Sequence, residues 1–504
     1  MTEVVRVERG RYHDSVTLMR ASAAAQDIPG VETVIAAMGT DLNRALLVQA
    51  GFPDPEATAD DLVVAVSADG PATAEEAVAA IERHLAGRGA GAVGGGHQPP
   101  APRTVESAAA RAPDAGVVVV SVPGPHAYVE AAAALRAGRH VMVFSDGVDV
   151  GAEVALKREA TTAGRLVMGP DCGTAILDGV GLGFANVVVP GAVALVAASG
   201  TGAQQLCCLL DGAGIGVRHV IGVGGRDLTS AVGGVSTLAA LAALDDDPAV
   251  EVIGLVSKPP DPEVAEAVMA AAEGCRTPVV AALVGPGRPT LTDAAAEIAR
   301  ALGAAAPDPQ WWRPPAGPGP ARPGPVLGLF SGGTNAAEAL VVLEERLGPV
   351  VSNVHHDPAR RIGPFDSAGG AHAVLDLGDD ALTAGRPHPM IDPAAVADRV
   401  RSGGAGAAAG PGVLLLDVVL GHGAHPDPAS VLAPALADAT ATGAAAVAVL
   451  VGTHGDPQGL DRQAHALVGA GAIVHRSNAH AAAEAAALAT GAGAEPIGTR
   501  SGRP

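Results

Sequence analysis

Ser199-Gly200-Thr201-Gly202 closes an apolar run at residues 194–198, and Ser331-Gly332-Gly333-Thr334-Asn335 closes a second run at residues 326–330. After each turn the apolar residues recur at helical spacing, which predicts a buried strand, a Gly-rich turn and a helix N-terminus. Such a turn presents unpaired backbone N–H groups and the positive end of the helix dipole, and its glycines let an anion approach closely. Two copies, each heading its own α/β unit, predict two helix ends that converge on one phosphate.

The composition indicates a globular, acidic chain. Its 504 residues suffice for three or four domains, 48% of them are hydrophobic, and the formal net charge is −21. Nucleic acids and anionic membranes call for basic patches, so neither is an expected partner. No apolar stretch of about 20 residues and no N-terminal signal pattern occurs, so we expect a cytoplasmic protein.

Lysine and cysteine usage narrows the chemistry. Only Lys157 and Lys258 are present and no G-x-x-x-x-G-K-[ST] sequence occurs, which excludes a P-loop, so backbone amides and arginines must handle any phosphate. The four cysteines form no C-x-x-C pair and are expected to be free thiols. Cys172 could be a nucleophile, but no histidine stands near it in the sequence, and a structural thiol is the favoured interpretation.

Strand-like apolar runs alternate with helical patterns along most of the chain. This alternation predicts an α/β protein with several doubly wound parallel-sheet domains, Rossmann-like and flavodoxin-like, after a small N-terminal α/β domain. Residues 307–325 are Pro-rich and are expected to be a linker that contains Trp311 and Trp312, and Gly/Pro-rich residues 87–102 are expected to be another. The expected domains are 1–90, 105–190, 191–305 and 326–492.

Several motifs together resemble one family. Gly169-Pro170-Asp171-Cys172-Gly173, the Ser199 turn and Gly222-Val223-Gly224-Gly225-Arg226-Asp227 resemble the α subunit of succinyl-CoA synthetase. The unit from Ser331 resembles the C-terminal ligase domain of its β subunit. Nearly the whole chain resembles FdrA-type proteins, through residues 10–15, 385–392 and 417–428. The resemblance implies a CoA-binding-like Rossmann domain at 105–190 followed by two ligase-type domains.

The chain also departs from the synthetase pattern. The loop that carries a phosphorylated histidine in that family corresponds to residues 283–290, which contain no histidine. The acidic residue that supports that histidine falls near Ser257-Lys258-Pro259, which holds no carboxylate. No counterpart of the ATP-grasp domain is recognisable, nor is the Gly-rich first turn of the CoA-binding domain. These departures argue against ATP-driven ligation and leave CoA as an open cofactor.

The FdrA resemblance implies a subunit of an oxamate carbamoyltransferase of anaerobic allantoin breakdown, which splits oxalurate with phosphate into oxamate and carbamoyl phosphate. Phosphate would then be a substrate, held in attack geometry by the two turns. The alternatives are an acyl-CoA synthetase of the succinyl-CoA ligase type and, in another class, a non-catalytic anion-binding scaffold. The resemblance implies other subunits as partners, and self-association is also expected.

The candidate phosphate-binding residues come from the two turns, although both turns could merely cap their helices. They are Ser199, Gly200, Thr201, Ser331, Gly332, Gly333 and Thr334. The candidate catalytic residues are Arg386, which could grip a carboxylate, His388, which could move a proton, and His425. Arg386 and His388 could equally lie in a solvated, Pro-bounded loop.

Further polar residues follow predicted strands, at the carboxyl edge where α/β sheets bind ligands. His425 lies there with His422 and Asp427; unliganded loop histidines are the favoured interpretation, and no metal site is predicted. Arg226 or Asp227 could reach inward from a tight loop, or lie in a surface turn. The remaining candidates are Thr453, His454 and Asp456 at the same edge and, in an expected solvated turn, His355, His356 and Asp357.

Overall fold

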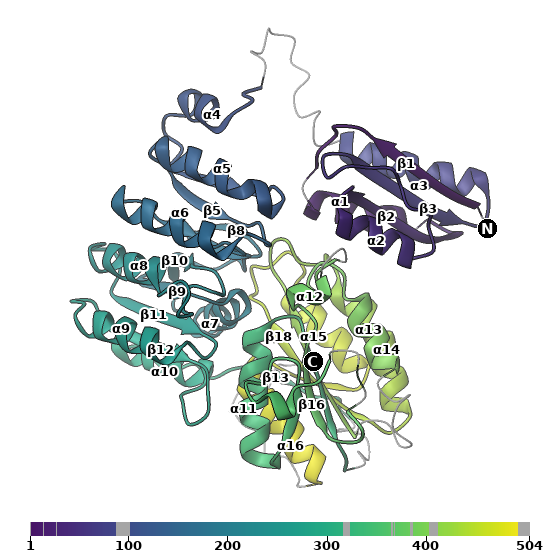
Figure 1. Ribbon diagram of the computed structural model, residues 1–504. Helices are drawn as coiled ribbons and strands as arrows, with labels where there is room; N and C mark the ends of the chain where they lie inside the picture. The colour runs from purple at the N-terminus through teal and green to yellow at the C-terminus, as the bar shows by residue number, and fades with distance from the viewer. Residues whose placement is uncertain are drawn as a thin grey trace. The chain divides into compact units, whose positions relative to one another are not determined.

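The computed structural model describes residues 2–13, 15–26, 28–86, 101–315, 323–363, 366, 368–383, 387–402 and 412–491. Contacts divide the chain into two compact units, which are coloured by residue number in Figure 1. The first unit comprises Met1–Pro102 and Asp380–Asp392, and the second comprises Arg103–Asp379 and Pro393–Pro504. None of the helices in these described ranges is both long enough and apolar enough to cross a membrane.

The first unit is a three-stranded antiparallel sheet in the order β1-β3-β2. Alternate residues of the central strand β3 face opposite sides: Leu62, Val64 and Val66 pack with α1 and α3, whereas Val63 and Ala65 pack with α2. The elements are β1 Thr2–Glu8, α1 Ser15–Gln26, β2 Val31–Met38, α2 Asp41–Gln49, β3 Leu62–Ala68, α3 Pro71–Ala86 and α12 Asp380–Thr383.

The second unit begins with a small parallel sheet in the order β4-β5-β6, with α5 and α6 packed together beside it. One face of this sheet packs with α5 and α6 in a core of its own, whereas Met142 and Met168 on the other face join a core of the six-stranded sheet. The elements are α4 Val105–Arg111, β4 Val117–Val120, α5 Gly124–Arg136, β5 His140–Val143, α6 Val150–Thr162 and β6 Val167–Met168.

A six-stranded sheet in the order β12-β11-β9-β10-β7-β8 follows. Strands β9 to β12 are parallel, and helices α7 and α10 cover one face while α8 and α9 cover the other. The elements are β7 Thr174–Leu177, β8 Val180–Gly183, β9 Val193–Ala197, α7 Gly200–Gly212, β10 Val217–Gly222, α8 Val235–Asp245, β11 Val252–Ser257, α9 Pro262–Glu273, β12 Val279–Leu283 and α10 Leu291–Ala301.

The last sheet has seven strands in the order β13-β19-β18-β17-β14-β16-β15, and all but the edge strand β13 are parallel. Its elements are β13 Trp311–Trp312, β14 Val326–Phe330, α11 Gly333–Leu347, β15 Val350–Ser352, η1 Pro358–Arg360, β16 His372–Asp376, α13 Ala394–Ser402, β17 Val413–Val419, α14 Pro428–Ala441, β18 Ala445–Val451, α15 Leu460–Gly469, β19 Ala472–His475 and α16 Asn478–Thr490.

This architecture confirms the predicted α/β class, with parallel sheets and a small N-terminal domain. Some details differ from the expectation. Trp311 and Trp312, expected in a linker, form strand β13, because Trp311 pairs with His475 and Trp312 with Val474 at the sheet edge. Strands β7 and β8 precede residue 191 but extend the six-stranded sheet. Strands β13 and β7 pair with strands that are distant in the sequence, which local periodicity does not register, and β8 adds a hairpin to β7.

Buried polar contacts join the six-stranded sheet to the seven-stranded sheet. Glu338 in α11 accepts hydrogen bonds from Leu291 N of α10 at 2.6 Å and from Asn478 Nδ2 of α16 at 2.8 Å. Arg476, after β19, donates to Cys208 O of α7 at 2.9 Å and receives a bond at its own carbonyl from Gln205 Nε2 at 2.7 Å. These polar groups are all buried, so separating the two sheets would leave several buried donors and acceptors without partners. The contacts therefore hold the two sheets in one arrangement.

Candidate anion site at two helix N-termini

The first Gly-rich turn connects β9 to α7 at the middle of the six-stranded sheet. Strand β9 lies between β10 and β11, so the chain first crosses to β10 on one side of β9 and then to β11 on its other side. Ligands of open α/β sheets bind at such a switch point, beyond the carboxyl ends of the strands. Ser199 caps α7, because its hydroxyl accepts a hydrogen bond from Gly202 N at 3.0 Å, while Gly200 at the helix start is exposed. The capping alternative therefore holds for Ser199, and the backbone of Gly200 stays accessible.

The second turn connects β14 to α11 and occupies the corresponding place in the seven-stranded sheet. Strand β14 lies between β16 and β17, which again makes a switch point. Helix α11 has Gly332 at its N-cap and no side-chain cap. Ser331 does not cap the helix; its backbone N–H donates to Asp417 Oδ1 at 2.7 Å. The first N–H groups of α11 are therefore available to an anion.

The two turns touch. A Cβ built on Gly332 would lie 2.8 Å from Thr201 Cβ, and the hydroxyl and methyl groups of Thr201 come closer still. A Cβ built on Gly202 would lie 2.8 Å from Thr334 Cγ2. Both threonines are buried, and neither hydroxyl has a hydrogen-bond partner in the described part of the chain. A larger residue at either glycine would force these side chains to move, so the N-termini of α7 and α11 meet where the threonine side chain of each turn lies against a glycine of the other.

Two buried carboxyl groups flank the α11 turn. Asp417 of β17 accepts from Ser331 N and, at 3.3 Å, from Asn335 Nδ2; burial raises its pKa to about 6. Asp376, the last residue of β16, has Oδ2 2.9 Å from the position that a Cβ would take on Gly333. Burial raises the pKa of Asp376 to about 7, even though Gly378 N donates to its Oδ1. Asp376 can therefore hold a proton near neutral pH, whereas Asp417 is mostly ionised there.

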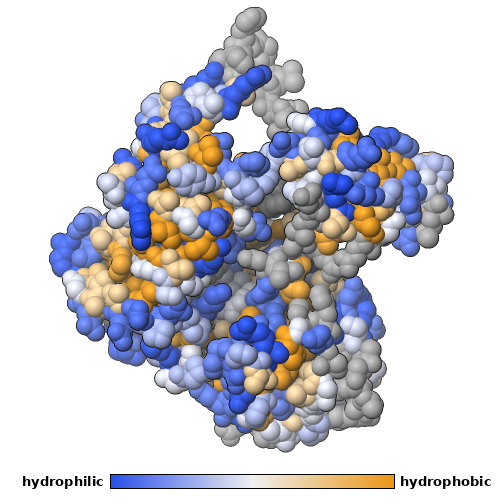
Figure 2. All heavy atoms as spheres, viewed as in Figure 1, coloured by the Kyte–Doolittle hydropathy of each residue, from blue (hydrophilic) through white to orange (hydrophobic). Residues whose placement is uncertain are grey.

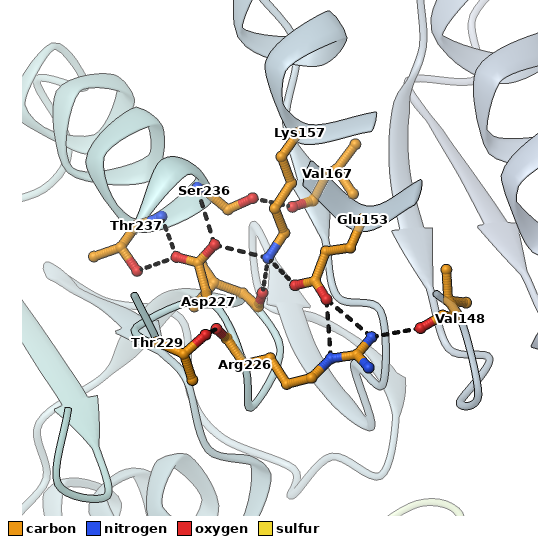
Figure 3. Close-up of polar contacts among 10 residues, drawn as sticks. Val148, Glu153, Lys157, Val167, Arg226, Asp227, Thr229, Ser236 and Thr237 are labelled. Carbon is orange, nitrogen blue, oxygen red and sulfur yellow. Dashed lines mark hydrogen bonds and ion pairs between the residues drawn. The ribbon is translucent and has the colours of Figure 1, made fainter. Parts of the chain in front are cut away.

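The two lysines have opposite roles. Lys157 is fully buried and donates at 2.7 Å to Glu153 and to Asp227, and at 2.9 Å to the carbonyl of Val223 (Figure 3). Lys258 follows β11, is exposed, and forms no ion pair within the described ranges. Its positive charge lowers the pKa of Asp376, against the larger effect of burial. Lys258 is thus the lysine that can serve an anion at the two turns.

Asp227 reaches inward from its loop, which is one of the two interpretations that the sequence allowed. Its partner there is Lys157. Asp227 also accepts from Ser236 N at 3.2 Å and from Thr237 N at 2.9 Å, which fixes the start of α8 (Figure 3). Arg226 pairs with Glu153 at 2.9 Å and caps the carbonyl of Val148. This network of two cations and two carboxylates joins α6 to the β10–α8 loop and is structural.

The structure does not test the roles of the predicted catalytic residues. Arg386 lies outside the described residues. His388 belongs to the unit of Met1–Pro102 and Asp380–Asp392, where burial lowers its pKa to about 4. His425 lies in the second unit, but its Nδ1 accepts from Asp427 N at 3.0 Å and its carbonyl from Gln458. Their catalytic roles remain predictions.

The other loop candidates have structural contacts. Asp456 is buried and accepts from Asn186 Nδ2 at 2.8 Å, from Val187 N at 2.7 Å and from Thr453 N at 2.8 Å, which ties it to the segment after β8. His454 is exposed beside Asp461. Asp427 pairs with Arg462, and His422 is exposed. His355 is buried rather than solvated: its Nε2 contacts Glu344 at 3.2 Å and its ring stacks on His356, while Asp357 starts a 3-10 turn.

Cys172 does not look like a nucleophile in the folded chain. Its thiol is buried, and burial raises its pKa to about 12. A thiol with such a pKa is protonated at neutral pH and unreactive. The loop between β12 and α10 holds no histidine and ends in a capping box of Thr290 and Asp293, and Arg288 in it is exposed.

Comparisons with known proteins define the class first. Residues 329–488 match the family model of CoA-ligase, and residues 1–101 match that of the AllF heavy metal-associated domain. The α/β chain thus contains a CoA-ligase-type region at residues 329–488 and an AllF-type N-terminal domain at residues 1–101. Residues 1–101 contain no cysteine, the ligand that soft metal ions favour, and no cluster of potential metal ligands occurs among the described residues.

The particular family follows from a full-length relative. The chain is 35% identical to the uncharacterized protein YahF of Escherichia coli (strain K12) over 507 residues, which is 95% of this chain and 97% of YahF. It therefore belongs to the family of YahF. The narrower resemblance to FdrA-type proteins stays a prediction.

Solved structures of CoA-dependent enzymes are also similar. The ATP citrate lyase of Methanothrix soehngenii is 19% identical, over 36% of this chain and 31% of the lyase, with a TM-score of 0.32. The dinucleotide-forming acetyl-coenzyme A synthetase 1 of Ca. Korarchaeum cryptofilum is 16% identical, over 77% of this chain and 84% of the synthetase, with a TM-score of 0.30. Because these TM-scores are low, the fold is assigned from the sheets described above and not from these two structures.

Sequence reasoning missed Asp376, Asp417 and Lys258 as parts of this site. Each lies in or directly after a parallel strand that neighbours β9 or β14. A charged residue at the carboxyl end of a strand was the available signal. Strand β16 had not been predicted, so Asp376 could not be placed at that edge.

Proposed function

We propose that the chain is a subunit of a carbamoyltransferase that moves a carbamoyl group between a ureide such as oxalurate and phosphate. One observation carries the proposal: the N-termini of α7 and α11 meet at Gly332 and Thr201, with Gly200 accessible. Two such ends are suited to a dianion. The loop before α10 contains no histidine that could take up the phosphoryl group, so phosphate itself is the simplest reactant.

The proposed step is balanced with phosphate as the nucleophile. A phosphate oxygen attacks the carbamoyl carbon of oxalurate, and a bond forms between that oxygen and carbon. The bond from the carbamoyl carbon to the ureide nitrogen breaks, and the proton of the phosphate passes to that nitrogen. The products are carbamoyl phosphate and oxamate. The backbone N–H groups of the two turns would orient the phosphate and stabilise its charge.

Lys258 would assist the substrate. Lys258 is exposed, and its positive charge lowers the pKa of Asp376. It directly follows β11, the strand next to β9. An anionic ureide with a terminal carboxylate needs such a cation near the phosphate. The AllF-type N-terminal domain supports a ureide as the substrate class.

The test is an assay of carbamoyl phosphate. The purified chain, alone and with the products of neighbouring genes, is incubated with oxalurate and phosphate, and carbamoyl phosphate and oxamate are measured. We expect both products in equal amounts and only when phosphate is present. Thioester formation that depends on CoA and ATP, with no phosphorolysis, would overturn the proposal.

The second candidate is an acyl-CoA synthetase of the succinyl-CoA ligase type. It is favoured by the match of residues 329–488 to the CoA-ligase model. The absence of a histidine from the β12–α10 loop weighs against it, since ligation of that type needs a phosphoryl carrier. Incubation with radiolabelled ATP, followed by denaturing electrophoresis, distinguishes the candidates: a phosphorylated chain favours the ligase.

We also propose that other subunits, or a second copy, cover part of the surface. Figure 2 shows apolar atoms gathered over the part of the second unit that contains β8, β9 and β10. Large apolar side chains exposed around β8 are Val180, Val187 and Val189. Light scattering of the chain alone and with its gene neighbours tests this, and a monomer under all conditions would contradict it.

A further inference from the structure

We propose that Asp376 makes the anion site selective for oxyanions that carry a proton, so that it takes phosphate and rejects sulfate. The inference rests on the proposed binding of phosphate to the two turns and not on carbamoyl transfer. It assigns to Asp376 the role of a specificity-determining residue.

The position of Asp376 is set by strand pairing. Strand β16 is parallel to β14, with Asp376 opposite Phe330, the residue directly before the Ser331 turn. Its side chain therefore stands beside the N-terminus of α11. The Oδ2 atom is 2.9 Å from the Cβ position of Gly333, the first residue of that helix. Glycine at this position leaves room for the carboxyl group of Asp376.

The carboxyl group is buried yet only half satisfied. Asp376 is 5% exposed, and its Oδ1 accepts from Gly378 N at 2.9 Å. No hydrogen bond to Oδ2 occurs in the described part of the chain. Asp417, by contrast, uses both oxygens, on Ser331 N and Asn335 Nδ2. Oδ2 of Asp376 is not among the fully buried polar atoms that lack a partner, so it keeps contact with solvent and is the oxygen that a ligand could reach.

The hydroxyl groups of Thr201 and Thr334 complete the lining. Both side chains are at least nine-tenths buried, at the contact of the two turns, and neither hydroxyl has a partner within the described ranges. The site thus offers an anion donors from backbone N–H and hydroxyl groups, and one acceptor, Asp376 Oδ2. That mixture fits an anion that both accepts and donates hydrogen bonds.

Phosphate and sulfate differ in that respect. Phosphate keeps at least one proton at neutral pH, whereas sulfate is fully ionised and accepts only. One proton between Asp376 and a phosphate oxygen makes a charge-assisted hydrogen bond. Sulfate would face the carboxylate with no proton between them, and like charges in a buried site repel strongly. The neighbouring charges do not remove this difference: among the described residues, Asp379 and Asp417 raise the pKa of Asp376 and Lys258 lowers it.

Burial supports this assignment, because it raises the pKa of Asp376 to about 7. The pair of Asp376 and a phosphate monoanion holds the same number of protons as protonated Asp376 with a phosphate dianion. The proton can therefore reside on either partner at neutral pH. Sulfate could bind only at the cost of protonating Asp376 from solvent.

The test is isothermal titration calorimetry of the full-length chain with inorganic phosphate and with sulfate, at pH 9 and constant ionic strength. We expect phosphate to bind about 100-fold more tightly than sulfate, because at pH 9 sulfate must bind with uptake of a proton by a carboxyl group whose pKa is about 7. Asp376→Asn keeps an acceptor for Gly378 N and presents a donor to the anion. This variant should bring the phosphate-to-sulfate ratio close to one, mainly through tighter sulfate binding.

Asp379→Asn is the matched control, because it removes a neighbouring negative charge without touching the Oδ2 position. It should leave the ratio near the wild-type value. Equal binding of both anions by the wild-type protein, or no binding of either, would overturn the inference without any variant. Selective phosphate binding together with no carbamoyl transfer would support the inference and refute the proposed function, so the two failures are distinguishable.

Discussion

Replacing Gly332 by alanine should separate the two helix ends on which the anion site depends. Gly332 has φ −164° and ψ 140°, an extended conformation that alanine adopts without strain. The effect of Gly332→Ala is therefore steric. The new Cβ would stand 2.8 Å from Thr201 Cβ, and nearer still to the Thr201 hydroxyl and methyl groups.

The magnitude follows from this distance. Carbon atoms in good contact are about 3.5 Å apart, so the turns must open by at least about 0.7 Å. Thr201 is buried in α7, and both sheets are joined by buried hydrogen bonds, so neither side yields easily. Overpacking of this kind costs about 1–3 kcal/mol. If this whole cost falls on the anion-bound state, phosphate binding should weaken about 5- to 140-fold, since each 1.4 kcal/mol is a factor of ten.

Urea unfolding measures the free energy of unfolding, and calorimetry measures phosphate affinity. Gly469→Ala is the control: Gly469 ends α15, and no atom lies within 4 Å of its Cβ position. We expect this control to be neutral or slightly stabilising, because glycine is a poor helix former. The double change Gly332→Ala with Thr201→Gly should recover part of the affinity. If Gly332→Ala bound phosphate as tightly as wild type with unchanged stability, the contact between the turns would be refuted.

Three more predictions concern buried groups. Lys157→Met should destabilise the fold by about 3–5 kcal/mol in urea unfolding, because two buried carboxylates lose their cation, whereas Lys258→Met should change stability by less than about 0.5 kcal/mol. The pKa of Asp376 rises from 3.8 to about 7 on folding, so the native state holds the proton more tightly than the unfolded state. The free energy of unfolding of the wild type should therefore decrease as the pH is raised from about 4 to about 7. Asp376→Asn should flatten that slope in thermal unfolding. Iodoacetamide at about pH 8 should alkylate the half-buried Cys275 well before Cys172, as measured by peptide mass spectrometry.

Each of these expectations has a contradicting result. Equal stabilities of Lys157→Met and wild type would show that the buried network contributes little. Parallel pH profiles for Asp376→Asn and wild type would show that its carboxyl group titrates normally in the native state. Rapid alkylation of Cys172 in the folded protein would restore it as a candidate nucleophile.

The repeated pattern of an apolar run, a Gly-rich turn and a helix could be interpreted from sequence because each copy is local. Strands β9 and β14 and helix α7 lie within a residue or two of the expected bounds, and α11 begins at the second turn as expected. The α/β class followed for the same reason, since hydrophobic periodicity is a property of short windows. Short strands such as β13 and β16 escaped, because their structure depends on pairing with a distant strand.

The sequence by itself therefore determined the class of fold, the two Gly-rich turns and the absence of a carrier histidine from the loop before α10. Tertiary structure alone decided that Gly332 meets Thr201, that Lys157 is buried in an ion-pair network while Lys258 is exposed, and that Asp376 stands beside α11. The physical reason is one of range. Propensity and periodicity act over a few residues, whereas burial and charge environment are set by chain segments that come together only when the sheets assemble.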